Sequence, residues 1–192
     1  MWLSTRDKGN TTGLTYTVNS VTAGDIVTAS LAKQWARVDT SDDDTLFTLL
    51  IEGVEEMAEK YMGLSLRTKD VTVEYAEFGN EVILPLGPHT SVDAVRTKYQ
   101  GTETTLGTGE YFVTGQDFKT LHIVESFTDQ QLEVDLTVGY GAANVPPLMK
   151  MGLLKAILSN YEDRQDIISG TIIASLPNES KKLFDRYRRR VF

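Results

Sequence analysis

The spacing of apolar residues changes twice along this chain. Between Ser41 and Gly63, apolar residues recur every three or four positions, which predicts an amphipathic helix. From residue 66 to residue 138, short runs alternate apolar and polar side chains between glycine-containing turns, which predicts antiparallel strands. Helical spacing returns after Pro146. The pattern therefore predicts an α+β fold, an α-helical bundle of three to four helices with an inserted antiparallel β region.

Local signals place the other helices. A short helix is expected after Thr28, with Thr28 or Ser30 as its cap. A long helix begins at Pro146-Pro147, where a missing N–H costs nothing, and its apolar stripe is wide enough to predict a largely buried helix. The last helix starts at Pro177-Asn178, and its apolar side consists of Leu183, Phe184 and Tyr187.

The same pattern divides the chain into three parts. Residues 1–27 are rich in Thr, Ser, Gly and Asn and are predicted to form an extended N-terminal arm. Residues 28–65 and 139–192 are predicted to form the helical core domain, because each helical part has an apolar face that needs cover. Residues 66–138 then form a β sub-domain inserted into that core.

Charge is distributed unevenly along the chain. The net charge is −8, yet the twelve residues from Lys181 to Phe192 carry +5, which leaves −13 on the other 180 residues. An acidic body with a basic tail indicates two surfaces with different partners, and the body should repel free duplex DNA. An equally good interpretation is a solubilised body whose tail complements a helix dipole.

The residues that could carry chemistry do not form a recognisable site. Asp42-Asp43-Asp44 lacks the spacing of a calcium loop and is better explained as the capped start of a helix. His89 and His122, the only histidines, lack metal-ligand spacing. Gly139-Tyr140-Gly141 matches neither nucleotide-binding glycine motif. We predict no catalytic, cofactor-binding or metal site, and no enzymatic activity.

Composition also bears on where the protein acts. The chain has no cysteine, so it has neither disulfides nor a thiolate nucleophile. No apolar run reaches the roughly 18–20 residues that span a bilayer, and Met1 to Asn10 lacks the apolar segment of a signal peptide. We therefore expect a protein that is soluble and cytoplasmic where it is made, with no membrane partner.

A series of short phrases, in order, resembles one protein family. The phrases are Leu31 to Asp39, the stretch from Asp42-Asp43-Asp44-Thr45-Leu46 to Tyr61-Met62-Gly63, Gly139-Tyr140-Gly141, Val145-Pro146-Pro147, Tyr161-Glu162-Asp163-Arg164 and Leu176-Pro177. Together they span residues 28–192, and they resemble the head-to-tail adaptor (connector) proteins of long-tailed bacteriophages, prophages and gene transfer agents. Within residues 66–138 the likeness is one of pattern and not of motif.

The resemblance implies a structural role. Such proteins form a ring, usually of twelve copies, beneath the portal of a DNA-filled capsid. The ring extends the channel through which double-stranded DNA passes and docks the stopper or tail-completion protein. The chain would then reside in the neck of the virion, and in the host cytoplasm during assembly. The alternatives are another neck component, such as a stopper or tail-completion protein, a ligand-binding module and, from a different class, a small carboxylate- or metal-dependent hydrolase.

By the same resemblance, the C-terminal segment reaches the portal. The candidate portal-binding residues are therefore Lys181, Lys182, Arg186, Arg188, Arg189 and Arg190. These cations could neutralise an acidic portal rim or touch DNA phosphates at the mouth of the channel. We expect truncation after Asn178 to leave the body folded and to abolish portal docking.

Overall fold

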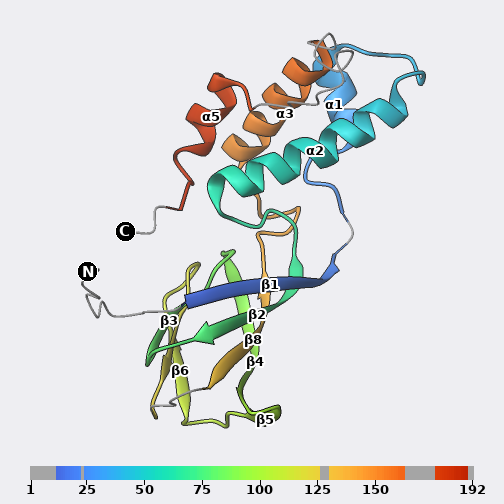
Figure 1. Ribbon diagram of the computed structural model, residues 1–192. Coiled ribbons are helices and arrows are strands. Elements are labelled where there is room, and N and C mark those ends of the chain that lie inside the picture. The colour runs from blue at the N-terminus through green and yellow to red at the C-terminus, as the bar shows by residue number, and fades with distance from the viewer. Residues whose placement is uncertain (1–11, 23, 126–129, 163–175, 190–192) are drawn as a thin grey trace, which may run out of the picture. The chain divides into compact units, whose positions relative to one another are not determined.

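The computed structural model divides the chain into two compact units, each made of two separate stretches of sequence (Figure 1). Its description covers residues 12–22, 24–125, 130–162 and 176–189. Residues 1–22 and 68–139 form the β unit, and residues 23–67 and 140–192 form the helical unit. Helices and antiparallel sheets are both present, which confirms the predicted α+β class.

The helical unit has four helices within the described residues. They are α1 (Ala29–Ala36), α2 (Asp44–Met62), α3 (Pro147–Glu162) and α5 (Asn178–Phe184). Thr28 caps α1 as predicted, since its hydroxyl oxygen accepts a hydrogen bond from the Leu31 N–H at 3.2 Å. Gly63 ends α2 as predicted, in the left-handed conformation with φ +68°.

The acidic start of α2 differs from the capping interpretation. Asp43 occupies the N-cap position but makes no side-chain capping bond. Its carboxylate instead accepts a hydrogen bond from the Tyr161 hydroxyl at 2.6 Å, and Asp44 forms an ion pair with Lys33 of α1. These acids therefore tie α2 to α3 and α1, because the neighbouring helices bring donors within reach.

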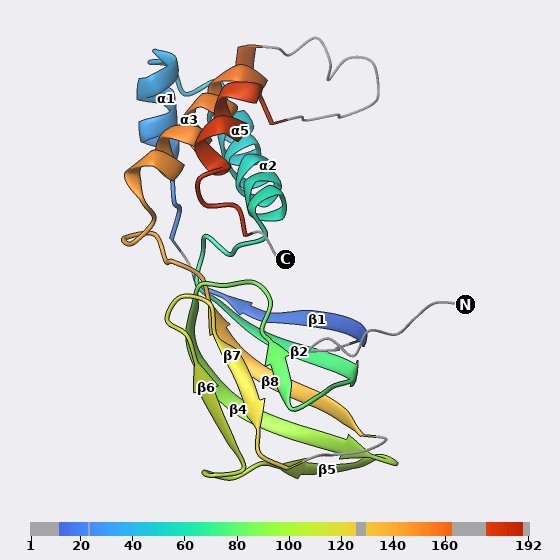
Figure 2. The ribbon, with the colours of Figure 1, turned by 90° about the vertical axis from the view of Figure 1, so that its left-hand side faces the viewer.

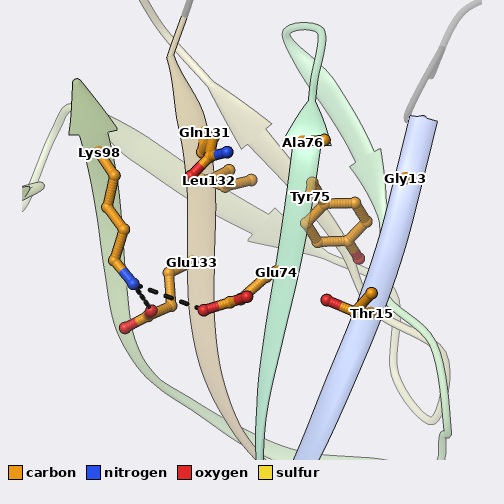
Figure 3. A pocket seen from close by; sticks show the side chains of 9 residues that line it. All are labelled: Gly13, Thr15, Glu74, Tyr75, Ala76, Lys98, Gln131, Leu132 and Glu133. Atoms are coloured by element: carbon orange, nitrogen blue, oxygen red, sulfur yellow. Dashed lines mark hydrogen bonds and ion pairs between the residues drawn. The ribbon is translucent and has the colours of Figure 1, made fainter. Parts of the chain in front are cut away.

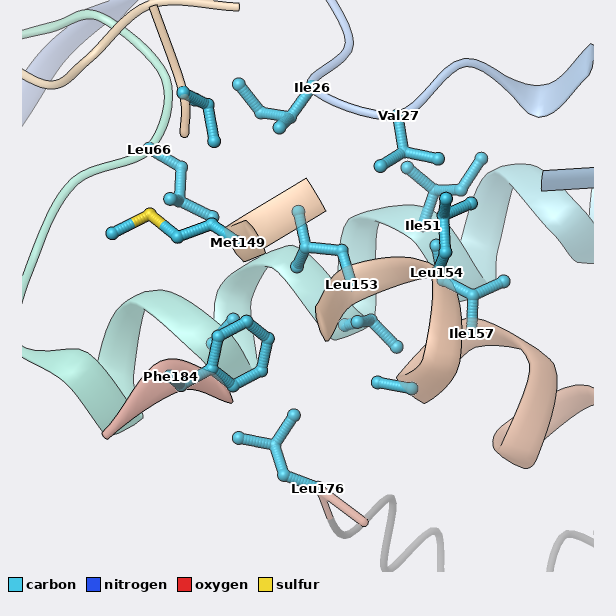
Figure 4. Close-up of a cluster of buried hydrophobic side chains, with 14 of the residues drawn as sticks. Ile26, Val27, Ile51, Leu66, Met149, Leu153, Leu154, Ile157, Leu176 and Phe184 are labelled. Carbon is cyan, nitrogen blue, oxygen red and sulfur yellow. The ribbon is translucent and has the colours of Figure 1, made fainter. Parts of the chain in front are cut away.

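The core of the helical unit forms where α2, α3 and α5 meet (Figure 4). α3 is largely buried, as its wide apolar stripe predicted. The ring of Phe184 is fully buried against Gly152 of α3, where an added Cβ would lie 2.6 Å from the ring. Gly152 therefore creates the space that α5 fills. The fully buried large side chains in this core are Phe47, Met62, Leu64, Leu66, Met149, Leu153 and Phe184.

The β unit contains two antiparallel sheets. One has five strands in the order β1-β2-β8-β4-β5, and the other has three in the order β3-β7-β6. The strands are β1 (Thr12–Val21), β2 (Lys69–Glu77), β3 (Glu81–Ile83), β4 (His89–Tyr99), β5 (Thr102–Thr105), β6 (Tyr111–Thr114), β7 (Thr120–Ile123) and β8 (Gln131–Val138).

A second apolar core lies inside the β unit, between the two sheets. Alternate residues of β2 and β8 point inward from the large sheet, and Val82 and Leu121 do so from the small one. Tyr75 of β2 is fully buried, and its hydroxyl donates to the Ile83 carbonyl of β3 at 3.1 Å. Each unit therefore has its own core.

The N-terminal arm prediction is wrong for residues 12–21, which form an edge strand. β1 pairs antiparallel with β2 from Thr12↔Glu77 to Val21↔Lys69. Its low apolar content obscured an alternation that places Leu14, Tyr16 and Val18 on one face. The rest of the predicted arm before residue 12 lies outside the described residues. Among the residues that the structure describes, no helix is long and apolar enough to cross a membrane.

Candidate functional site

The predicted basic segment is positioned by the packing of α5. Leu176, Ser180 and Phe184 are buried, which fixes one side of the segment against the helical unit. The opposite side therefore faces outward. Because Phe184 belongs to the core, truncation after Asn178 would remove a core residue along with the charges. We therefore no longer expect the body to stay folded after this truncation. Point substitutions of exposed cations test portal docking instead.

The six predicted portal-binding residues fall into three groups. Lys182 is exposed and forms an ion pair with Glu179 at 2.8 Å, and Arg186 is exposed without an ion pair to any residue that the structure describes. Lys181 and Arg189 are half-buried, and Arg188 is exposed. Arg190 lies outside the described residues. Lys182, Arg186 and Arg188 are thus the exposed cations within the described part of the segment, and of these Arg188 contacts α2.

The end of the basic segment is fastened to the C-terminus of α2. Arg188 lies over the Tyr61 ring, with its guanidinium carbon 4.9 Å from the ring centroid. The Arg189 N–H donates to the Met62 carbonyl at 2.9 Å. Cations are favourable at a helix C-terminus, where backbone carbonyls lack helical partners. Arg188, through its contact with the Tyr61 ring, and Arg189, through its backbone N–H, thus hold the segment against α2.

Tyr61 also binds the single acid of this segment. Its hydroxyl donates to the Asp185 carboxylate at 2.6 Å, and this hydrogen bond raises the pKa of Tyr61. Sequence reasoning counted Tyr61 only as part of an apolar stripe and gave Asp185 no partner. The two residues are far apart in sequence, and no local pattern predicts their contact.

Arg67, at the end of residues 23–67, forms ion pairs with Glu55 of α2 and with Asp25 near the start of that stretch. Arg67 donates to Glu55 of α2 at 2.7 Å and lies 3.3 Å from Asp25. Burial raises the pKa of Glu55 despite the partly compensating hydrogen bond and charge of Arg67. Glu55 Oε1 is buried without a hydrogen-bond partner among the described residues, which is consistent with that direction.

The polar face of the large sheet carries a second cluster of charges (Figure 3). A shallow hollow of about 230 Å³ is lined by β1, β2, β4 and β8, and Lys98 reaches across it. The Lys98 ammonium lies 3.5 Å from Glu74 and forms a closer ion pair with Glu133. Arg96 also donates to Glu133 from Nε at 2.8 Å. The cluster therefore links three strands.

These charges stabilise one another. Partial burial alone would raise the pKa of Glu133, but hydrogen bonds from Lys98 and Arg96 outweigh it and hold that pKa below its ordinary value. The Glu133 hydrogen bond raises the pKa of Lys98. Arg96 additionally pairs with Glu103 at 2.9 Å and with Asp135 at 2.7 Å. Both signs of charge are satisfied in place, which is the arrangement of a cross-strand stabilising network.

The histidines have packing roles. His89 is buried, and its ring nitrogens lie 2.7 Å from the Pro85 carbonyl and 3.1 Å from the Lys119 N–H. His122 stacks on Phe112 with ring centroids 4.7 Å apart and lies 2.9 Å from the Thr114 hydroxyl. Within residues 12–22, 24–125, 130–162 and 176–189, no three His, Asp or Glu side chains come together as a metal site would require.

Solved structures from gene transfer agent (GTA) particles contain chains with a similar fold. A chain in the neck of an empty GTA particle, computed with C6 symmetry, superposes with a TM-score of 0.71 at 20% identity, covering 92% of this chain and 97% of that one. A chain in the virion of a native GTA particle gives 0.70 at 20% identity, with 91% and 97% covered. A chain in the neck of a native GTA particle, computed with C12 symmetry, gives 0.60 at 19% identity, with 92% and 97% covered.

These comparisons establish that the fold is shared. The likeness spans nearly the whole of this chain and of each compared chain, so it includes both units. No family model matches the sequence, and no curated protein matches it.

Proposed function

We propose that this chain is a structural component of the neck of a tailed phage, prophage or gene transfer agent particle. Within the neck we assign it the role of head-to-tail adaptor, a non-catalytic ring beneath the portal that extends the DNA channel and docks the stopper or tail. The observation that carries this proposal is the fold likeness to chains from GTA particles, two of them in necks, over 91–92% of this chain.

Two further observations support the adaptor role. The ordered phrases from Leu31 to Leu176-Pro177 resemble the adaptor family independently of any superposition. The compared necks were computed with C6 and C12 symmetry, which favours a ring of identical subunits for this chain, with twelve copies as the proposed number. In that ring, the helical core would build the channel, and the inserted β sub-domain would lie on the outside of the ring or at its lower face.

The exposed part of the basic segment is the proposed portal contact. Lys182 and Arg186 are the candidates with accessible charge, while Arg188 and Arg189 hold the segment against α2. A ring of chains that each carry −8 would hold DNA weakly, which suits a channel through which the genome must move. Arginine and lysine at its rim would meet an acidic surface of the portal.

Electron microscopy of the chain mixed with its cognate portal tests this proposal. The expected result is added ring density on the narrow end of the portal. The free chain can be monomeric in this experiment, because the portal can act as the assembly template. Binding to isolated tails with no density on the portal would instead identify another neck component. Divalent-dependent cleavage of DNA by the purified chain would favour the hydrolase alternative.

A further inference from the structure

Strand β1 has an apolar face that the described part of this chain does not cover. Leu14, Tyr16 and Val18 pair with Tyr75, Val73 and Val71 of β2, so they point to the same side of the sheet as these buried residues. The β2 residues are at most 1% exposed, whereas the apolar residues of β1 are 42–51% exposed. The core face of the sheet therefore continues outward onto β1, the edge strand beside β2 (Figure 2).

An irregularity in β1 preserves this face over the whole strand. The register shifts between Val18 and Ser20, so one extra residue is accommodated there. The shift returns Val21 to the side of Tyr16, while Asn19 and Ser20 bond to Thr72 and Asp70 on the polar side. Without the extra residue, Val21 would lie on the polar face. We define the β1 row as Leu14, Tyr16, Val18 and Val21.

Apart from the register shift near Asn19, β1 also lacks two common protections of an edge strand, charge and proline. Natural edge strands commonly carry lysine, proline or inward-pointing charges that prevent pairing with other chains. The ten residues of β1 include no charged residue and no proline. β1 therefore has neither the charges nor the proline that would discourage contact with another chain.

A second uncovered apolar surface lies on the outer face of the small sheet. Val82 and Leu121 point inward, so the alternate residues Ile83 and Phe112 point outward, with Phe112 stacked on His122. Val124 continues this surface just beyond β7. Ile83, Phe112 and Val124 are 41–57% exposed, and we call them the Phe112 face.

We propose that the β1 row of one copy packs on the Phe112 face of a second copy of this chain. This inference rests on the proposed ring and names part of its subunit contact. Cyclic assemblies join two different, complementary surfaces of each subunit, and the β unit offers two such apolar surfaces. Each copy carries −8, so copies repel one another, and β1, which has no charged residue, offers a second copy an approach of low electrostatic cost.

Cross-linking with introduced cysteines tests the contact directly, because the natural chain has no cysteine. A Tyr16→Cys copy is mixed with a Phe112→Cys copy of different mass, free at high concentration and bound to portal, and treated with a short bis-maleimide. Thr17→Cys is the matched control, since Thr17 lies next to Tyr16 on the opposite face of β1. We expect the mixed link from residue 16 to exceed that from residue 17 about tenfold.

Equal linking from both positions, or linking mainly between two Tyr16→Cys copies, would overturn the inference. A charge test gives a second reading: Tyr16→Lys should lower ring formation about tenfold, while Thr17→Lys should not. Hydrogen exchange of β2 and β8 checks that both variants keep the β unit folded. Rings on the portal without the residue 16 link would leave the proposed function standing and remove this contact. The residue 16 link without portal docking would support this contact and remove the proposed adaptor role.

Discussion

The two units of this chain complete their surfaces in different ways. The helical unit closes its core with its own C-terminal segment, since Phe184 of α5 fills the space that Gly152 leaves on α3. The β unit satisfies its charges internally through Arg96, Lys98 and Glu133 but leaves the β1 row exposed. Phe184 is therefore a residue that the fold needs, whereas the β1 row is proposed to contact another copy.

The largest expected effect comes from comparing two phenylalanines. Phe184→Ala should cost about 3–5 kcal/mol of unfolding free energy in the helical unit, because it empties a fully buried site. Phe112→Ala should cost less than about 1 kcal/mol, because that ring is 54% exposed. Hydrogen exchange measured along a denaturant series reports each unit separately. Equal costs for the two variants would contradict this division into core and contact residues.

Two helical glycines sharpen the contrast within the helical unit. Gly152→Ala should destabilise by about 1–3 kcal/mol, because its Cβ would collide with the buried Phe184 ring. Gly53→Ala in α2 has no atom within 4 Å of the new Cβ and should stabilise by up to about 1 kcal/mol through helix propensity. Thermal unfolding of both variants measures the two signs. Stabilisation by Gly152→Ala would show that the Phe184 ring moves away from the new Cβ.

Sequence periodicity was sufficient for the α+β class and the burial of α3, because both depend on local spacing, whereas it left the cap of α1 open between Thr28 and Ser30. It was insufficient for β1, where four apolar residues in ten looked like a polar arm. The alternation of Leu14, Tyr16 and Val18 is present in the sequence, but the place of Val21 on the same face depends on the register shift near Asn19.

The candidate site was likewise predictable only in part. The basic segment was visible from composition, but the division of labour within it was not. The separation of Arg188 and Arg189, held at the end of α2, from the exposed Lys182 and Arg186 depends on contacts between residues more than 100 positions apart. Such contacts leave no local pattern in a single sequence.

The two units should respond to acid with opposite signs. Burial raises the pKa of Glu55, so the folded helical unit binds its proton more readily than the unfolded chain does. Its stability contribution therefore falls as the pH rises from the ordinary value of 4.5 towards the raised one. The pKa of Glu133 is lowered, so its contribution to the β unit is present above 4.5 and is lost as the pH falls through the lowered value.

Amide variants test this pH dependence. Glu55→Gln should flatten the pH dependence of the helical unit, and Glu133→Gln should cost the β unit about 1–3 kcal/mol at pH 7, because a charged acceptor is lost. Hydrogen exchange of each unit between pH 4 and 7, corrected for intrinsic exchange rates, measures both. A helical unit that gains stability steadily as the pH rises from 4.5 would reverse the assignment for Glu55.

The smallest effect on stability should accompany the largest effect on docking. The double variant Lys182→Glu with Arg186→Glu changes exposed side chains and should cost no more than about 1 kcal/mol, through loss of the Lys182–Glu179 pair and through acids placed at the end of α5. If these charges meet an acidic portal rim, portal affinity should fall about tenfold or more, with a weaker salt dependence than that of the natural chain. Arg37→Glu with Lys60→Glu, at two other exposed cations of the helical unit, is the matched control for net charge. An equal loss from both pairs would indicate a long-range charge effect and would remove the basic segment as a specific contact.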